Sequence, residues 1–184
     1  MTWPTAVGRS MQLVIVHYHL NRGGVTQVIH SQLRALARTD GVGSEIQGVT
    51  LLYGGRRQGW PGDLDPPLPV PLERIEWPAL DYDSATPQPA GTLADELKQA
   101  LRRAGLTPER TLLHVHNHAL GKNAGWTASI PSLAQSGYRL LLQIHDFAED
   151  FRPAAYRRLI AALANDRPAD LPRSLYPQAS HIHY

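Results

Sequence analysis

The sequence predicts an α/β fold with a doubly wound, mainly parallel sheet and helices on both of its faces. Short apolar runs alternate along the chain with longer segments whose apolar residues recur at helical spacing. The first run, residues 13–17, is continuously apolar up to its last residue, His17, as expected of a parallel strand that is buried on both sides. Right-handed crossovers between successive strands then give the strand order 3-2-1-4-5-6.

The size and composition of the chain suit one soluble domain. With 184 residues, 42% of them hydrophobic and 18% charged, residues 1–184 should form a single domain with a sizeable core. No apolar run is long enough to span a bilayer, and the first residues lack the apolar core of a secretory signal. The chain has no cysteine, which excludes disulfides and thiolate metal sites and suits a cytoplasmic protein.

The charge balance argues against a nucleic-acid partner. The 18 basic and 16 acidic residues leave a net charge of only +2. A nucleic-acid interface needs basic residues gathered on one face. The arginine pairs 56–57, 102–103 and 157–158 lie far apart in the sequence, so we expect no such interface.

The first half of the chain contains three predicted strands. After the strand at 13–17, the sequence at 21–24 makes a turn, an amphipathic helix follows at 25–37, and 45–53 is the second strand. Residues 60–90 hold eight of the fifteen prolines and form an extended excursion around a third strand at 72–77. Residues 81–89 are expected to be a surface loop.

The second half continues the alternation. Thr92 is expected to cap a helix, with Asp95 at the capping-box position. Strands follow at 111–115 and 139–144, separated by a helix at 126–135 that Pro131 could divide into two segments. A helix begins at Pro153, and residues 180–184 open a sixth strand. The whole arrangement is Rossmann-like, with its crevice between the first and fourth strands.

Eight of the nine histidines lie at or near the expected carboxyl ends of strands; they are His17, His19, His114, His116, His118, His145, His181 and His183. Ligands of open α/β sheets bind beyond these strand ends, and imidazole changes its charge near neutral pH. The clustering therefore predicts chemistry at this edge, with His114, which comes earlier in its strand, expected to be packed and hydrogen-bonded.

Two further features lie at the same expected edge. Gly23 and Gly24 stand between the first strand and a helix N-terminus, where backbone amides could approach a phosphate. A tight turn that requires positive φ explains the pair equally well. His145 is followed by Asp146, and together these side chains could bind a sugar hydroxyl.

These motifs resemble the N-terminal half of GT-B glycosyltransferases of the retaining, family-four type. The resemblance runs from about residue 11 to residue 163 and rests on the sequences at 21–25, 113–117 and 142–146. It implies a transferase that moves a sugar from a nucleotide-sugar donor to a carbohydrate or other hydroxyl acceptor, without a metal or other cofactor. The departing diphosphate would help to deprotonate the acceptor.

The resemblance also assigns roles to residues. It implies that Gly23 and Gly24 contact the donor diphosphate and that His145 faces the donor sugar as the catalytic residue. The predicted substrate-binding residues on the acceptor side are His17, His116, Asn117, His118 and Asp146. The donor domain of the family is absent from this chain, so we expect an inactive N-terminal domain, located in the cytoplasm or peripherally at the inner membrane face.

Two alternatives remain open at this point. The spacing of His114, His116 and His118 is also typical of a zinc site, to which His145 and Asp146 could add ligands, so a metal-dependent hydrolase competes with the transferase. The other alternative is a non-catalytic module that binds a sugar or a nucleotide.

Overall fold

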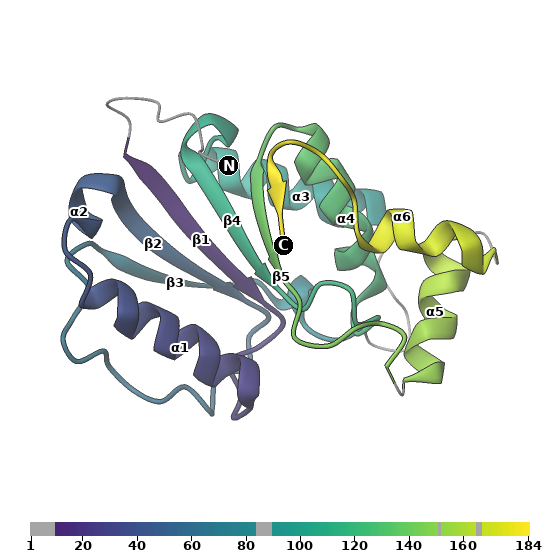
Figure 1. The fold of residues 1–184 in the computed structure, drawn as a ribbon, viewed down its shortest axis with the longest axis horizontal. Helices are drawn as coiled ribbons and strands as arrows, with labels where there is room; N and C mark the ends of the chain where they lie inside the picture. The colour runs from purple at the N-terminus through teal and green to yellow at the C-terminus, as the bar shows by residue number, and fades with distance from the viewer. Residues whose placement is uncertain (1–9, 84–89, 151, 165–166) are drawn as a thin grey trace.

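The computed structural model describes residues 10–83, 90–150, 152–164 and 167–184, and it contains a single six-stranded sheet (Figure 1). The strand order is β3-β2-β1-β4-β5-β6 and every pairing is parallel, which confirms the predicted topology. The strands are β1 (Met11–His17), β2 (Ile46–Tyr53), β3 (Leu72–Glu76), β4 (Thr111–His116), β5 (Arg139–Gln143) and β6 (Ile182–His183).

Helices cover both faces of the sheet. Helix α1 packs on one face, called the α1 face below, and α3 and α4 pack together on the other (Figure 1). The α-helices are α1 (Gly24–Ala37), α2 (Val42–Glu45), α3 (Ala90–Arg103), α4 (Ala124–Gln135), α5 (Pro153–Leu163) and α6 (Leu171–Leu175). Short 3₁₀ turns occur at Pro78–Leu80, Pro108–Arg110 and Pro168–Asp170.

The core has one layer on each side of the sheet. Leu13 and Ile15 of β1 pack with Ile29 of α1, whereas Val14 and Val16 pack into the layer under α3 and α4. Side chains of a strand alternate between its two faces, so a continuously apolar strand supplies both layers. The same alternation places His17, His114 and His116 on the α1 face.

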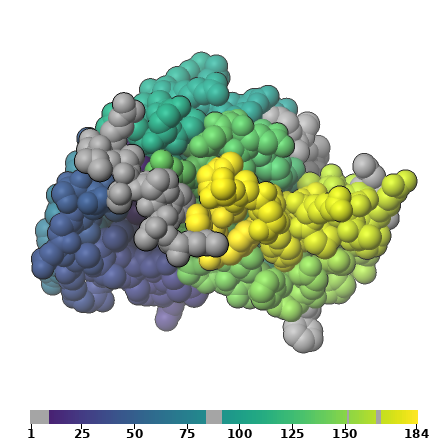
Figure 2. Space-filling view, turned by 45° about the horizontal axis from the view of Figure 1, so that its top comes forward, coloured from purple at the N-terminus to yellow at the C-terminus, as the bar shows by residue number. Residues whose placement is uncertain are grey.

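The C-terminal segment lies against β5 and α5 (Figure 2). Helices α5 and α6 share a small separate core around Leu159 and Leu171. Strand β6 pairs only with Leu140 and Leu141, in the first half of β5. None of the described helices combines the length and apolar character needed to cross a bilayer.

Two helix starts differ from the sequence expectation. Helix α3 begins at Ala90, so Thr92 lies in its first turn and does not cap it. Helix α4 begins at Ala124 and continues through Pro131 without division. Ile130 and Leu133, both fully buried, anchor α4 on either side of the proline, and this packing outweighs the loss of one helical hydrogen bond.

Candidate functional site at the carboxyl edge of the sheet

The crevice lies where β1 and β4, the central neighbours of the sheet, come to an end. Their crossovers leave in opposite directions, which separates the two following loops and creates a ligand-binding position. The Tyr18 hydroxyl, at the end of β1, donates to the carbonyl oxygens of Asn117 (3.0 Å) and His118 (3.2 Å) at the end of β4. The two loops therefore meet, as the sequence predicted.

Four imidazoles from three adjacent strands form what we call the histidine cluster: His17, His114, His116 and His145. The ring centroids of His114 and His116 are 4.4 Å apart, those of His116 and His145 5.2 Å, and those of His17 and His116 6.3 Å. His116 Nδ1 and His145 Nε2 are joined by a 2.9 Å hydrogen bond. The structure thus brings together three predicted site residues, with His116 at the centre.

The buried members of the cluster are uncharged near neutral pH. Burial, reinforced by the neighbouring imidazoles, lowers the pKa of His116 to about 2. Burial and the proximity of His19 lower the pKa of His17 to about 3. Burial also lowers the pKa of His145, although the Asp146 carboxylate opposes that change.

Gln143, the last residue of β5, contacts one member of the histidine cluster, His114. Gln143 Oε1 lies 2.9 Å from His114 Nε2 and accepts a hydrogen bond from Gln32 Nε2 of α1 at 2.8 Å. His114 is 8% exposed. This confirms the expectation that His114 is packed and hydrogen-bonded.

Asn117 connects the end of β4 to the loop after β5. Its backbone has φ = 58°, a left-handed conformation that asparagine tolerates better than most residues. Its side-chain oxygen accepts from the backbone N–H groups of His145 (2.9 Å) and Asp146 (3.1 Å), and its amide nitrogen donates to the Asp146 carboxylate (3.0 Å). That donation, with Arg152 3.4 Å from the same carboxylate, lowers the pKa of Asp146.

Three predicted positions lie elsewhere. His118 is fully buried and donates from Nε2 to the carbonyl oxygen of Leu175 in α6 (2.7 Å), so it faces away from the crevice. His181 precedes β6, so the expectation that it lies at a strand's carboxyl end is wrong, whereas His183 is the last residue of β6. Because β6 pairs only with Leu140 and Leu141 of β5, His183 lies short of the edge at which His116 and His145 lie. His181 Nε2 donates to the carbonyl oxygen of Ala134.

The glycine pair forms an open, uncapped helix start. Gly23 is the N-cap of α1 and has an extended backbone, and no side chain caps this end. Neither Gly23 nor Gly24 has a φ in the left-handed region, so the alternative of a turn that requires such a φ is wrong. A Cβ atom on Gly24 would meet nothing within 4 Å, and one on Gly23 would only touch the Asn21 carbonyl oxygen at 3.9 Å. The described part of the chain therefore leaves room beside the Cα atoms of both glycines.

The loop between β1 and α1, residues 18–23, is called the glycine loop below, and it packs against the loop that follows β2. Gly59 donates its backbone N–H to the Leu20 carbonyl oxygen at 3.2 Å, and the Leu20 N–H donates to the Arg56 carbonyl oxygen at 2.6 Å. A Cβ atom on Gly59 would lie 1.6 Å from the backbone nitrogen of Arg22. The two loops therefore fit together only because residue 59 has no side chain.

The sequence analysis missed an ionic and aromatic group beside the crevice. Arg56 pairs with Asp81 through two hydrogen bonds, and its guanidinium lies 4.9 Å from the ring centroid of Tyr82. The Lys122 ammonium lies 4.9 Å from the same ring, and His19 Nε2 lies 3.1 Å from the Tyr82 hydroxyl.

This group was missed because residues 81–89 were expected to form a surface loop. Asn123 holds the start of that segment with hydrogen bonds to the carbonyl oxygens of Ala79 and Asp81, each 2.8 Å long. The Asp83 carboxylate accepts from the N–H of Ala124 at the start of α4. Residues 84–89 lie outside the described part of the chain. No sequence pattern signals these long-range contacts.

The zinc-site alternative finds no support in the geometry. Among the described residues, no three His, Cys, Asp or Glu side chains are arranged to hold a metal ion. Within the histidine cluster, His114 and His116 direct nitrogens at Gln143 and His145, which leaves fewer lone pairs free to converge on a common point.

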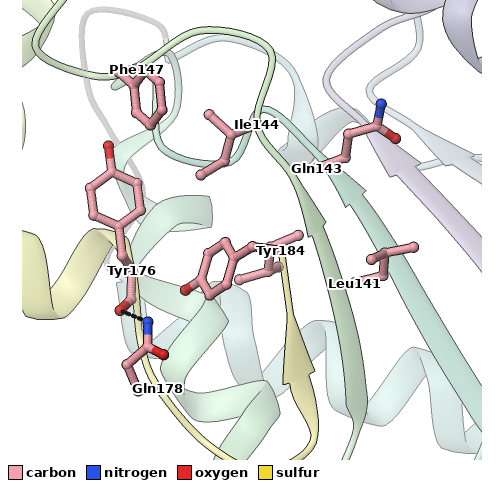
Figure 3. Close-up of a pocket in the computed structure, with 8 residues that line it drawn as sticks. Leu141, Gln143, Ile144, Phe147, Tyr176, Gln178 and Tyr184 are labelled. Atoms are coloured by element: carbon pink, nitrogen blue, oxygen red, sulfur yellow. Dashed lines mark hydrogen bonds between the residues drawn. The ribbon is translucent and has the colours of Figure 1, made fainter. Parts of the chain in front are cut away.

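A second hollow, of about 630 Å³, lies beside the open end of β5 (Figure 3). The rings of Phe147, Tyr176 and Tyr184 and the side chain of Ile144 surround it. It is mostly apolar, and Phe147 and Tyr184 are 54% and 50% exposed. The short pairing of β6 explains why this edge of β5 is uncovered.

Comparison with known proteins gives one informative similarity. Over 176 residues the chain is 28% identical to the mannosylglucosyl-3-phosphoglycerate synthase of Petrotoga mobilis. The alignment covers 94% of this chain and 31% of that enzyme, so the chain spans about a third of the relative's length. No protein-family model and no solved structure matches the chain.

Proposed function

We propose that this chain is the acceptor-side domain of a glycosyltransferase that moves a sugar from a nucleotide-sugar donor to a hydroxyl group. The observation that carries the proposal is the similarity, along 94% of the chain, to an enzyme named for making a glycosylated phosphoglycerate. The parallel sheet with a crevice at its switch point is compatible with this activity, although folds of this kind support many reactions.

The proposed donor site lies at the start of α1. A 14-residue helix carries a partial positive charge at its N-terminus, and here the first amides have no side-chain cap. The absence of side chains on Gly23 and Gly24 would let a diphosphate approach these amides closely.

The proposed sugar site lies at the end of β5. His145 and Asp146 are partly exposed, whereas His17 and His116 are 5% and 0% exposed. We therefore assign direct sugar contacts to His145 and Asp146, and supporting roles to His17, His116 and Asn117. His118 is left out because it is bonded to α6.

We further propose the GT-B architecture and the retaining, family-four type. The motif at 21–25 leads into α1, and those at 113–117 and 142–146 run from the ends of β4 and β5 into the loops at the crevice, which supports the assignment. The chain would then work with a second, donor-binding domain. Its alignment with only 31% of a longer transferase is compatible with that division.

The test is a transfer assay on the protein expressed from its complete reading frame, with radiolabelled UDP-glucose and GDP-mannose as donors and 3-phosphoglycerate and its glucoside as acceptors. We expect label to appear in a product whose anomeric configuration, read by proton NMR, matches that of the donor. Inversion would remove the retaining assignment. Donor binding by calorimetry without any transfer would instead favour a binding module, and hydrolysis that depends on retained zinc would favour the hydrolase.

A further inference from the structure

The hydrogen bond between His116 and His145 restricts how His145 can present its ring. The bond joins His116 Nδ1 to His145 Nε2 at 2.9 Å, with the two ring planes 13° apart. It is the only side-chain hydrogen bond of His145 among the described residues. The other nitrogen of His145, Nδ1, has no partner there and is not one of the buried unpaired atoms, which leaves it open to a ligand.

Only one proton can lie in this bond, because both rings are neutral near pH 7. In a neutral imidazole one nitrogen donates and the other accepts. Either His116 donates from Nδ1 or His145 donates from Nε2. The first arrangement puts the proton of His145 on Nδ1, and the second puts a lone pair there.

The buried surroundings of His116 distinguish the two arrangements. Its Nε2 is buried and has no partner among the described residues. If His116 accepted the bond, Nε2 would carry an unpaired N–H group in the core. Buried unpaired N–H groups are rarer than buried unpaired acceptors, so donation from His116 is the favoured arrangement.

His118 provides a reference within the same protein. Its Nε2 faces the carbonyl oxygen of Leu175, which can only accept, so the proton lies on Nε2. The remaining nitrogen, Nδ1, is buried and unpaired, and it must be a bare lone pair. This fold therefore already tolerates an unpaired imidazole lone pair in its core.

We propose that His116 is a positioning residue that donates Nδ1–H to His145 Nε2 and thereby fixes the proton of His145 on Nδ1. His145 then presents a hydrogen-bond donor to the crevice and cannot act there as a base. Its ligand is an oxygen atom with a free lone pair, such as a sugar hydroxyl or a phosphoryl oxygen. Only this choice of ligand rests on the proposed function.

The direct test is long-range ¹⁵N–¹H correlation NMR of the ¹⁵N-histidine-labelled chain at pH 7.5, with His145→Gln used to assign the His145 signals. We expect Nδ1 of His145 to have the chemical shift of a protonated nitrogen and Nε2 that of an unprotonated one. The reverse pattern would overturn the proposal. The readout needs no substrate, so it remains decisive even if the proposed transferase activity is absent.

Two variants separate positioning from packing. In His116→Asn the side-chain amide lies near the former Nδ1 and can still donate, so His145 should keep its tautomer. In His116→Leu the donor is lost, and the Nε2-protonated form of His145 should appear in the spectrum. An unchanged tautomer in His116→Leu would contradict the proposal.

His118→Asn is the matched control. It breaks the bond to Leu175 and lowers the unfolding temperature, but it should leave the His145 tautomer unchanged. In the complete protein, with UDP-glucose and GDP-mannose as probes, His116→Leu should lower kcat/KM about tenfold or more, as the loss of one hydrogen bond to the ligand implies, whereas His116→Asn should stay within about threefold. Equal losses in the two variants would reduce His116 to a packing role.

Discussion

His145 combines an accessible ring with few attachments to the fold. Within the described part of the chain its side chain makes one hydrogen bond, to His116, while Asn117 accepts a hydrogen bond from its backbone N–H. In the complete protein, His145→Ala should therefore lower the free energy of unfolding by only about 1 kcal/mol. We expect turnover to fall about 100-fold or more if the ring contacts the reacting sugar.

Denaturant unfolding and transfer kinetics on the same preparation check this prediction. His118→Ala provides the comparison. It removes a fully buried ring, so we expect its main effect to be a lower free energy of unfolding. Parallel losses of turnover and stability in His145→Ala would show that the ring has only a packing role.

Gly24 allows a clean substitution at the proposed phosphate site. An alanine Cβ would meet nothing within 4 Å, and the backbone has no positive φ, so Gly24→Ala should leave the unfolding temperature unchanged or raise it slightly. Affinity for UDP-glucose or GDP-mannose, measured by calorimetry on the complete protein, should fall about tenfold if the amides contact phosphate.

Gly43→Ala is the matched control for this substitution. Gly43 lies in α2, and an alanine there would make only ordinary contacts at 4.0 Å. Its effect on donor affinity should be negligible. If Gly24→Ala binds the donor as tightly as Gly43→Ala, the glycine loop is not a phosphate site.

At the residue scale, the sequence located part of the candidate site. His17, His116 and His145 could be placed together because parallel strands end at a common edge. Tyr82 and Arg56 could not be, because Asn123 holds the remote segment that contains Tyr82, and Arg56 is joined to that segment through Asp81. His118 follows a strand end as well, but burial against α6 turns it away, and periodicity carries no information about such packing.

At the scale of elements, Asn117 ties the end of β4 to the loop after β5. Asn117→Ala removes three side-chain hydrogen bonds and puts alanine at φ = 58°. We expect a loss of about 2–4 kcal/mol in unfolding free energy. Asn117→Gly loses the same bonds without the φ penalty and should be less destabilising by about 1 kcal/mol, as urea unfolding can measure.

The same substitutions should change the titration of Asp146. The amide of Asn117 is the main cause of the lowered pKa of this carboxyl group, so both variants should raise that pKa. A carboxyl group with a lowered pKa contributes stability above its unfolded pKa and loses it as the pH falls through the folded value. An Asp146 titration, followed by carbon-13 NMR, that stays the same in both variants would contradict the proposed connection.

Most elements were predictable because each has its own local pattern. The alternation of buried strands with amphipathic helices gave the strand order, since crossover handedness leaves few topologies. The bounds and continuity of the helices were less predictable. Pro131 does not divide α4, and Thr92 does not begin α3, because tertiary packing decides both and local propensity does not.

At the scale of the whole molecule, the buried histidines make the fold sensitive to acid. Burial lowers the pKa of His17 to about 3, of His116 to about 2 and of His118 to about 4. In the unfolded chain each titrates near its ordinary pKa of about 6.5. Below that pH the unfolded state binds more protons than the folded state, so stability falls as the pH falls.

Urea unfolding between pH 7.5 and pH 5 measures this effect. The slope of the unfolding free energy should approach about 1.4 kcal/mol per pH unit for each buried histidine. His118→Gln, which can keep a hydrogen-bond donor near the carbonyl oxygen of Leu175, should reduce the slope by the contribution of one buried histidine. Equal stability at the two pH values would show that these rings are accessible to protons in the folded state.

The contact between Gly59 and the backbone of Arg22 has a consequence for engineering this protein. The loop after β2 packs against the glycine loop and helps to determine its conformation, although more than thirty residues of chain separate them. Libraries designed to test the proposed donor site can vary the glycine loop itself. They should keep Gly59 constant. Any larger residue at position 59 would displace the backbone of the glycine loop at Arg22 and obscure the effect of every other change.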